Sequence, residues 1–199
     1  MAFTAGYFPE LLILEDDVVR IEPMTEAHFE ALLPIAMERQ LWRFTSADIQ
    51  TAADFKQYFD QALVDRQAGL AYPFVYLEKA TGNYVGSTRF GNIEPAHKKL
   101  EIGWTWLSPK LHGTGFNRRC KFLLLQYGFE TLNLNRIELK TSTLNNISQK
   151  AMQNIGAVKE GTLRRHMVIA NGTVRDTMYF SFIKEEWEAT KQQYFLPYL

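Results

Sequence analysis

The chain has 199 residues, of which 46% are hydrophobic, and its 22 basic residues balance its 22 acidic residues. This length and apolar content suit one domain over residues 1–199 with a core large enough to fold alone, so a second full domain is not expected. Because the formal net charge is zero, no overall field attracts nucleic acid or an anionic membrane, and neither is predicted as a partner.

Cysteine usage and the N-terminal residues favour a cytoplasmic protein. Cys120 is the only cysteine, which excludes an internal disulfide framework and a zinc site built from cysteines. Residues 1–19 lack a positively charged start, and Glu15-Asp16-Asp17 interrupts their only apolar run, so neither a signal peptide nor a membrane span is expected. The four histidines are too dispersed to predict a metal site.

The first half of the chain predicts a strand, two helices and a hairpin. Residues 18–23 predict the strand, Thr25 is placed to cap the first helix, and a second helix is expected from about Thr51. The β-rich runs Phe74–Glu78 and Tyr84–Phe90 are joined through a short Gly-containing connection. They are therefore predicted to pair as antiparallel neighbours.

The next run, Leu100–Leu107, alternates in a way typical of a strand between two environments. The alternation assigns a core face to Leu100, Ile102, Trp104 and Trp106, and an opposite face to Glu101, Gly103 and Thr105. We expect the second face to border a cleft. A loop, His112–Gly115, follows Pro109 and precedes a helical stretch in which Cys120 shares the apolar face, so this cysteine is predicted to be core.

The last third alternates strands with a helix. The predicted strands are Arg136–Thr141, Leu163–Ile169 and Arg175–Ile183. Between the first two, Asn145 is placed to cap a helix that Gly156 ends in a left-handed conformation. The whole pattern predicts an α+β sandwich.

The loop before the third helix is suited to an anion, since glycines before a helix N-terminus expose unpaired N–H groups. It lacks the Gly-Lys-Ser/Thr of a Walker A motif, and Arg118 stands where the third glycine of Gly-x-Gly-x-x-Gly would be. Both nucleotide-binding classes are therefore disfavoured. A plain tight turn at Gly113 and Gly115 is the alternative.

The same loop resembles the pyrophosphate loop of the GNAT superfamily of N-acetyltransferases, Gln/Arg-x-x-Gly-x-Gly/Ala. It is written His112-Gly113-Thr114-Gly115-Phe116-Asn117, and it departs from that pattern at its first and last positions. Four further segments look like the ribosomal-protein N-terminal acetyltransferase (RimJ/RimL-like) branch, namely Leu100–Trp104, Asn145–Ser148, Ile155–Gly161 and Asn171–Trp187. The resemblance thus covers nearly the whole chain.

The resemblance implies a GNAT fold, with a mixed, mostly antiparallel sheet of about seven strands and about four flanking helices. It also implies acetyl-CoA as cofactor. The residues expected to contact it are Trp106, Leu107, His112, Gly113, Thr114, Gly115, Phe116, Asn117, Arg118, Asn145 and Ser148. The alternative for Asn145 is that it only caps a helix, and the alternative for Arg118 is that it is a basic residue exposed to solvent.

For chemistry, Glu101 is the carboxylate expected to take a proton from the acceptor, with a cross-strand partner role as its alternative. Ser148 is expected to donate to the departing thiolate, because residues 147–155 lack the tyrosine usual in the family. A backbone N–H near Trp106 or Leu107 would stabilise the oxyanion. His112, His166 and Asp176 are weaker candidates.

The predicted function is transfer of an acetyl group from acetyl-CoA to a primary amine, either a protein N-terminal α-amine or a small amine, by direct attack in a ternary complex. Trp42, Arg43, Phe44 and Glu101 are the residues expected to line the acceptor site. A homodimer is compatible with the resemblance. The alternative is a catalytically idle GNAT-like module that binds acyl-CoA or a protein partner.

Overall fold

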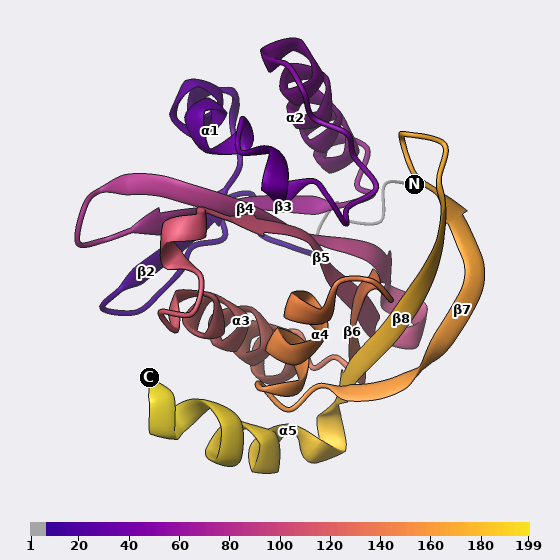
Figure 1. Cartoon of the computed structure of the whole chain (residues 1–199). Helices are drawn as coiled ribbons and strands as arrows, with labels where there is room; N and C mark the ends of the chain where they lie inside the picture. The colour runs from indigo at the N-terminus through magenta and orange to yellow at the C-terminus, as the bar shows by residue number, and fades with distance from the viewer. Residues whose placement is uncertain (1–6) are drawn as a thin grey trace.

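The computed structural model describes residues 7–199, which build one mixed sheet with helices on both faces (Figure 1). The strand order is β1-β2-β3-β4-β5-β6-β8-β7. The strands are β1 Leu14–Glu15, β2 Val19–Pro23, β3 Tyr72–Glu78, β4 Asn83–Glu94, β5 Lys99–Leu107, β6 Arg136–Ser142, β7 Val158–Val168 and β8 Val174–Ile183. The α-helices are α1 Phe29–Ala36, α2 Ala52–Gln67, α3 Phe116–Gln126, α4 Asn146–Gln153 and α5 Lys184–Thr190. All neighbouring strands are antiparallel except β5 and β6, which confirms the predicted architecture.

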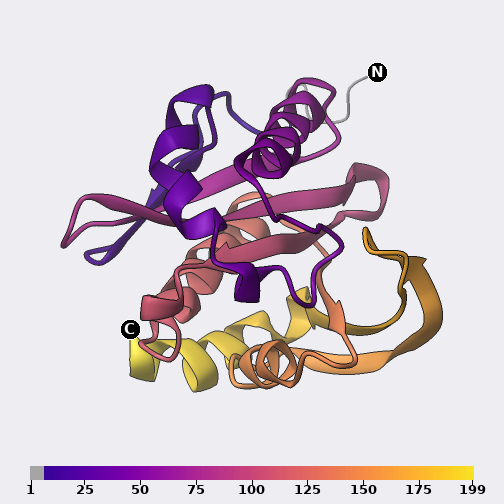
Figure 2. The same ribbon diagram turned by 45° about the horizontal axis from the view of Figure 1, so that its top comes forward.

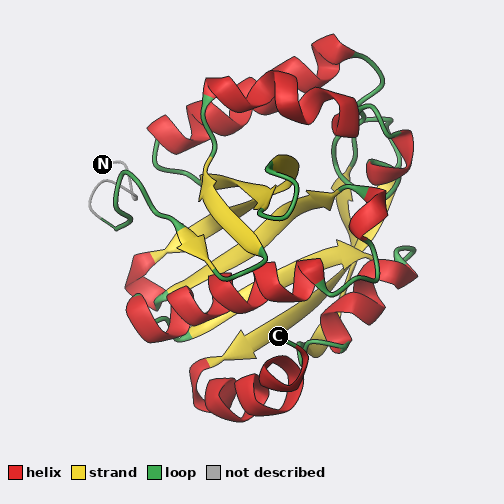
Figure 3. Cartoon of the chain, turned by 90° about the vertical axis from the view of Figure 1, so that its left-hand side faces the viewer, coloured by secondary structure: helices red, strands yellow, loops and turns green. Residues whose placement is uncertain are grey.

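Helices α1 and α2 cover one face of the sheet, and α3, α4 and α5 lie on the other (Figures 1 and 3). The sheet therefore separates two apolar cores. The larger core, on the α3 face, includes Phe74, Phe90, Ile102, Leu124 and Phe180. The smaller core, under α1 and α2, includes Leu32, Phe55, Phe59, Val75 and Trp106. Within residues 7–199, each helix is too short or too polar to cross a membrane.

The predicted helix boundaries follow from local capping. Thr25 caps a short 3-10 turn that leads into α1, and its N–H donates to His28 Nδ1 at 2.9 Å. Thr51 and Asp54 form a reciprocal capping box at the start of α2. Gly156 has φ 85°, so the left-handed conformation expected after α4 is confirmed.

Some elements differ from the sequence prediction. The short strand β1 and the helix α5 were not predicted. Strand β7 begins at Val158 rather than Leu163, where it pairs with β8. Because β7 is an edge strand that is exposed along most of its length, it carries no period-2 alternation that would reveal its start.

Strand β5 contains a bulge that overturns the predicted alternation. Ser87 pairs with Trp106 and Arg89 with Gly103, so β5 has one more residue than β4 between these pairs. Trp104 has φ 52° and is 39% exposed. The prediction that Trp104 and Trp106 share the core face of Leu100 and Ile102 is therefore wrong. An extra residue reverses the side-chain phase, and Trp106 packs in the core under α1 and α2 instead.

Strands β5 and β6 pair only at their beginnings. The parallel ladder joins Lys99 to Arg136 and ends at Glu101 and Glu138. Both strands continue, β5 to Leu107 and β6 to Ser142, without further pairing to each other. The edge of β5 that would face β6 therefore has backbone groups that the ladder leaves unpaired.

Candidate active site

The glycine loop adopts the conformation that its sequence requires. Gly113 and Gly115 have φ 77° and 89°, and a Cβ at either position would meet no other atom within 4 Å. Glycine is thus needed here for backbone conformation, and both residues are open to a ligand. Within residues 7–199, the N–H groups of Gly113, Gly115 and Asn117 have no acceptor. Such N–H groups at a helix start form a concavity suited to phosphate oxygens.

The remaining loop side chains mostly stabilise the loop. Thr114 Oγ1 donates to the carbonyl of Leu111 at 2.9 Å and accepts from the N–H of Phe116 at 3.3 Å. His112 Nε2 lies 3.0 Å from the carbonyl of Leu107, which ties the loop to the end of β5. Phe116 itself is buried in the larger core.

Asn117, which departs from the family loop, has an unusual environment. Its Oδ1 atom is buried and has no hydrogen-bond partner among residues 7–199. Buried polar atoms in native proteins are nearly always paired, so we expect a hydrogen-bond donor from outside the chain to complete this acceptor. An amide oxygen and a phosphate oxygen both accept, so the fit of the loop to a diphosphate rests on the unpaired N–H groups of Gly113, Gly115 and Asn117.

The two arginines of α3 differ in their contacts. Arg119 forms ion pairs at 2.9 Å with Asp16 and Asp17, which bind it to the turn before β2. Arg118 donates to the carbonyl of Asn154 at 3.2 Å and stacks over the ring of Tyr198 at 4.2 Å. Of these two arginines, Arg118 is the one without an acidic partner among residues 7–199, and it lies beside the end of α4.

Asn145 and Ser148 open α4. Asn145 Oδ1 accepts from the N–H of Ser148 at 3.1 Å, so the capping role weighed for Asn145 is present. Ser148 is partly buried. The helix follows β6 directly, at the end of that strand where β5 and β6 no longer pair.

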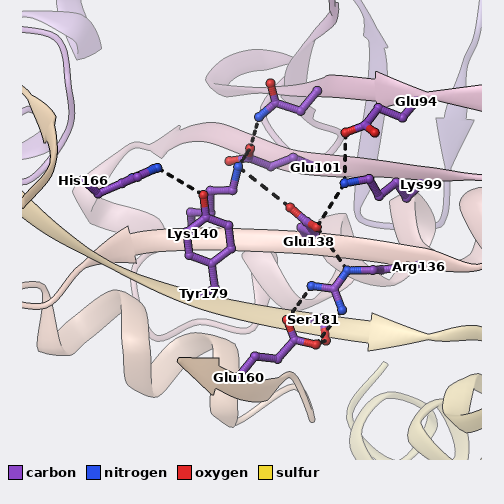
Figure 4. Close-up of polar contacts among 11 residues, drawn as sticks. Glu94, Lys99, Glu101, Arg136, Glu138, Lys140, Glu160, His166, Tyr179 and Ser181 are labelled. Carbon is purple, nitrogen blue, oxygen red and sulfur yellow. Dashed lines mark hydrogen bonds and ion pairs between the residues drawn. The ribbon is translucent and has the colours of Figure 1, made fainter. Parts of the chain in front are cut away.

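Glu101 is 7% exposed and lies on the α1/α2 side of β5, the same side as Trp106. The expectation that it faces away from the tryptophans is wrong because of the bulge. Its Oε2 atom lies 2.8 Å from Lys140 Nζ and accepts from Asn92 Nδ2 at 2.5 Å (Figure 4). Glu101 is also folded over Gly103, where an added Cβ would lie 2.7 Å from Oε1.

Lys140 and Tyr179 join Glu101 from the neighbouring strands β6 and β8. Burial disfavours the charge of Lys140, but its attraction to Glu101 outweighs burial and raises the pKa of the lysine above its ordinary value. Lys140 Nζ lies 4.8 Å from the centre of the Tyr179 ring, and the Tyr179 hydroxyl lies 3.3 Å from His166 Nε2. The sequence did not single out Lys140, Tyr179 or Asn92, since their proximity depends on strand register.

The ion network continues across the sheet towards its far edge. Glu138 lies between Arg136 and Lys99, at 3.1 Å and 3.7 Å, and Arg136 also pairs with Glu160 of β7 at 2.5 Å. Figure 4 shows this row of alternating charges from β4 to β7. These side chains satisfy one another, and they fix the register of the strands that carry Glu101 and Lys140.

The segment between α1 and α2 and the turn between β7 and β8 together line a pocket of about 210 Å³. Figure 2 shows the backbone of both segments. Arg43 is exposed and lines the pocket. Trp42 forms its inner wall but is itself buried, and its indole N–H donates to the carbonyl of Ala36 at 2.7 Å. Phe44 binds Arg175 of β8 through its carbonyl at 3.3 Å.

Other candidates have structural contacts. Asp176 Oδ1 accepts from the N–H of Arg165, a residue with φ 50° in an irregular part of the β7–β8 ladder. Cys120 is buried, as predicted, and burial raises the pKa of its thiol. Leu107 packs in the larger core. Among residues 7–199, no group of three or more His, Cys, Asp or Glu side chains is placed to hold a metal ion.

With the fold and this site in view, the class of the protein is clear: the chain belongs to the acetyltransferase (GNAT) domain family, which matches residues 19–158. The predicted resemblance to GNAT enzymes is thereby confirmed, and the chain is an acyltransferase of that family.

Particular relatives agree. "Putative ribosomal N-acetyltransferase YdaF" from Bacillus subtilis (strain 168) is 32% identical over 136 residues, which cover 68% of each chain. The crystal structure of a GCN5-related N-acetyltransferase from Brucella melitensis superimposes with a TM-score of 0.85 at 30% identity, and covers 94% of this chain and 85% of that one. Mycobacterium smegmatis RimJ in complex with CoA-disulfide has a TM-score of 0.74 and 90% coverage of both chains; at 22% identity it shows the fold alone.

Proposed function

We propose that this chain transfers the acetyl group of acetyl-CoA to a primary amine by direct attack of that amine in a ternary complex. The observation that carries the proposal is the open glycine loop at the start of α3, which follows the stretch of β5 that no longer pairs with β6. The loop offers unpaired N–H groups to a diphosphate, and the unpaired edges of β5 and β6 offer backbone partners to the amides of a pantetheine arm. The CoA-disulfide named for Mycobacterium smegmatis RimJ supports this ligand class.

Bound acetyl-CoA would supply a thioester carbonyl carbon that the amine nitrogen attacks, with loss of CoA as its thiol. Glu101 takes the proton that the attacking amine loses. Lys140 and Asn92 contact Oε2 and hold the Glu101 carboxylate in one orientation. Ser148 at the start of α4 would donate a hydrogen bond to the departing sulfur, which takes its proton from solvent, and a backbone N–H near Trp106 or Leu107 would bind the carbonyl oxygen.

The acceptor we place first is the α-amine of a protein N-terminus, and a small amine such as a polyamine, amino acid or aminoglycoside comes second. An α-amine has a reference pKa of about 7.7–8.0, against about 10.4 for lysine, so a carboxylate base deprotonates it far more readily near neutral pH. The pocket beside Arg43 is the region that we assign to this chain end. Arg175, which donates to the carbonyl of Phe44 at 3.3 Å, lies on β8, the strand that also carries Tyr179 of the Glu101 cluster.

The rival function is an idle module that binds acyl-CoA or a protein partner. Two features favour it: the His112 ring is engaged by the carbonyl of Leu107, and residues 147–155 of the α4 region contain no tyrosine. A screen of free peptides, their N-terminally acetylated counterparts and small amines separates the two. Transfer to free peptides alone supports the first acceptor class. Binding of acetyl-CoA with transfer to no amine supports the idle module.

Calorimetric titration tests the cofactor, with acetyl-CoA, desulfo-CoA and ATP compared on wild type, Gly115→Val and Gly172→Val. We expect about micromolar, CoA-selective binding by wild type. Gly115→Val removes it, because a β-branched residue cannot easily keep φ 89° in the loop. Gly172 has φ 80° and open surroundings in the distant β7–β8 turn, so its variant carries similar strain and retains binding. Tight binding by folded Gly115→Val contradicts the loop's role.

A further inference from the structure

A buried lysine on α3 has no part in the reaction described above. Lys121 is 5% exposed, yet no carboxylate lies within ion-pair distance of it among residues 7–199. Its Nζ atom has one hydrogen-bond partner, the hydroxyl of Thr105 on β5, at 2.9 Å. An ammonium without a counter-ion is costly to bury, and an apolar side chain would pack in its place at no such cost. The lysine is therefore a candidate for function.

The contacts of Lys121 form a chain with a fixed direction. Thr88 Oγ1 donates to the carbonyl of Gly103 at 3.2 Å, and the hydroxyls of Thr88 and Thr105 are 2.7 Å apart. A threonine hydroxyl has only one hydrogen, so Thr105 must donate to Thr88. Thr105 can then only accept from Lys121. The order is Lys121 to Thr105 to Thr88 to the Gly103 carbonyl.

This chain spans the bulge of β5. Gly103 and Thr105 are the two neighbours of Trp104, whose φ of 52° is unfavourable for a residue with a side chain. On the opposite face, the guanidinium carbon of Arg89 lies 5.7 Å from the centre of a Trp104 ring, and Arg89 Nη1 lies 3.3 Å from Asp65 on α2. The bulge is thus held from both sides of the sheet, by α2 and by α3.

The bulge lies directly before Trp106 and Leu107, in the part of β5 that no longer pairs with β6. We propose that Lys121 is a positioning residue which, through Thr105 and Thr88, holds the Trp104 bulge so that a backbone N–H near Trp106 meets the acetyl carbonyl of the bound donor. This inference rests on the proposed acetyl transfer. Lys121 Nζ is hydrogen-bonded to Thr105, the residue before Trp106, and from there the positive charge of Lys121 favours negative charge developing on the carbonyl oxygen.

The titration of Lys121 separates its charge from its hydrogen bond. Burial lowers the pKa of Lys121 to about 8, and the facing groups are Tyr76 of β3, Thr88, Thr105 and its neighbour Cys120. Burial raises the pKa values of Tyr76 and Cys120, so both stay neutral near pH 8. A neutral amine still donates to Thr105 but carries no charge. Turnover is therefore expected to fall above about pH 8.

The kinetic test compares Lys121→Met and Thr105→Val with two controls, Thr105→Ser, which keeps the hydroxyl, and Cys120→Ala, which alters the same buried stretch of α3 without a polar contact. We expect kcat to fall by about 10- to 100-fold in the first two variants, with acetyl-CoA affinity within about threefold of wild type. The fall in turnover above pH 8 disappears in Lys121→Met. Both controls keep wild-type kcat per folded molecule.

A second readout needs no turnover. In ¹⁵N–¹H spectra of the whole protein, the amide signals of Gly103, Trp104 and Thr105 should shift in Lys121→Met and Thr105→Val but not in Cys120→Ala. The inference is overturned if the amide signals of the bulge do not shift, or if Lys121→Met keeps the kcat and the pH profile of wild type. Neither outcome contradicts the proposed acetyl transfer. If wild type binds no acetyl-CoA, the proposed function falls instead, and the role of Lys121 towards the donor falls with it.

Discussion

Gly103→Ala offers the sharpest test of Glu101. The Glu101 side chain lies over Gly103, and the added methyl would be 2.7 Å from Oε1 and 3.2 Å from Cδ. To reach the 3.4 Å of an ordinary contact, the carboxylate must move by about 0.7 Å. That displacement disturbs contacts of 2.8 Å to Lys140 and 2.5 Å to Asn92. The glycine has ordinary backbone angles, so alanine adds no conformational strain.

A misplacement of about 1 Å in a reacting group can reduce a rate by about 100-fold, so we expect kcat to fall roughly 10-fold. Affinity for acetyl-CoA should stay unchanged, because the glycine loop is not disturbed. The assay is steady-state turnover with the best amine, together with calorimetry and thermal unfolding. Gly161→Ala on β7 is the matched control, since a Cβ there meets no atom within 4 Å. Wild-type kcat in Gly103→Ala would refute a base role for Glu101 that depends on its position.

Three further predictions concern the same framework. Glu101→Gln should reduce turnover and spare acetyl-CoA affinity, and the added change Lys140→Met should not recover turnover. Unchanged turnover across pH in Glu101→Gln contradicts the base role. Gly156→Ala should lower the free energy of unfolding by about 2–3 kcal/mol, because the backbone there has a φ of 85° and the added methyl would lie 2.6 Å from Tyr194. Gly172→Ala has similar backbone strain but no close contact, so it should cost about 1 kcal/mol. Equal losses in the two variants would contradict the role of the Tyr194 contact. Lys121→Met should be more stable than wild type at pH 7 by up to roughly 3 kcal/mol, because burial lowers the pKa of Lys121 from 10.5 to about 8 and the folded protein therefore binds this proton less tightly than the unfolded chain. The gain in the free energy of unfolding should vanish as the pH rises from 8 to 10.5. A difference in denaturant unfolding that does not depend on pH would speak against a buried charge.

Local sequence signals predicted the helices and strands well, whereas the arrangement of the candidate site depends on contacts between residues far apart in the sequence. Thr51 and Gly156 mark helix ends through interactions with near neighbours, so the sequence shows them directly. The bulge at Trp104 cannot be recognised in this way. A regular alternation of large and small side chains continues through the bulge in sequence, while the backbone reverses its phase in space. The assignment of Trp106 to the wrong core follows from that single inserted residue.

The partners of Glu101 were missed for a related reason. Lys140 lies on β6, which pairs in parallel with β5 only up to Glu101 and Glu138, and Tyr179 is opposite Lys140 on β8. No spacing within the sequence encodes that register. The signal available was chemical: a lysine between Leu139 and Thr141, in a strand whose apolar residues face the core, needs an anion on the other face.

Departures from regular structure concentrate in one stretch of this chain, and this clustering indicates why they are present. Between Glu101 and Lys121 the β5–β6 ladder ends, Trp104 takes a left-handed conformation, two glycines have positive φ, and an unpaired ammonium is buried. Each feature costs stability by itself, and none is required to close the two apolar cores, which α1, α2, α3 and α5 already complete. Features that burden folding and yet cluster around one strand end are best explained by selection for what binds there. If so, variants that regularise this stretch should gain stability and lose turnover together, whereas variants that weaken the cores should lose both.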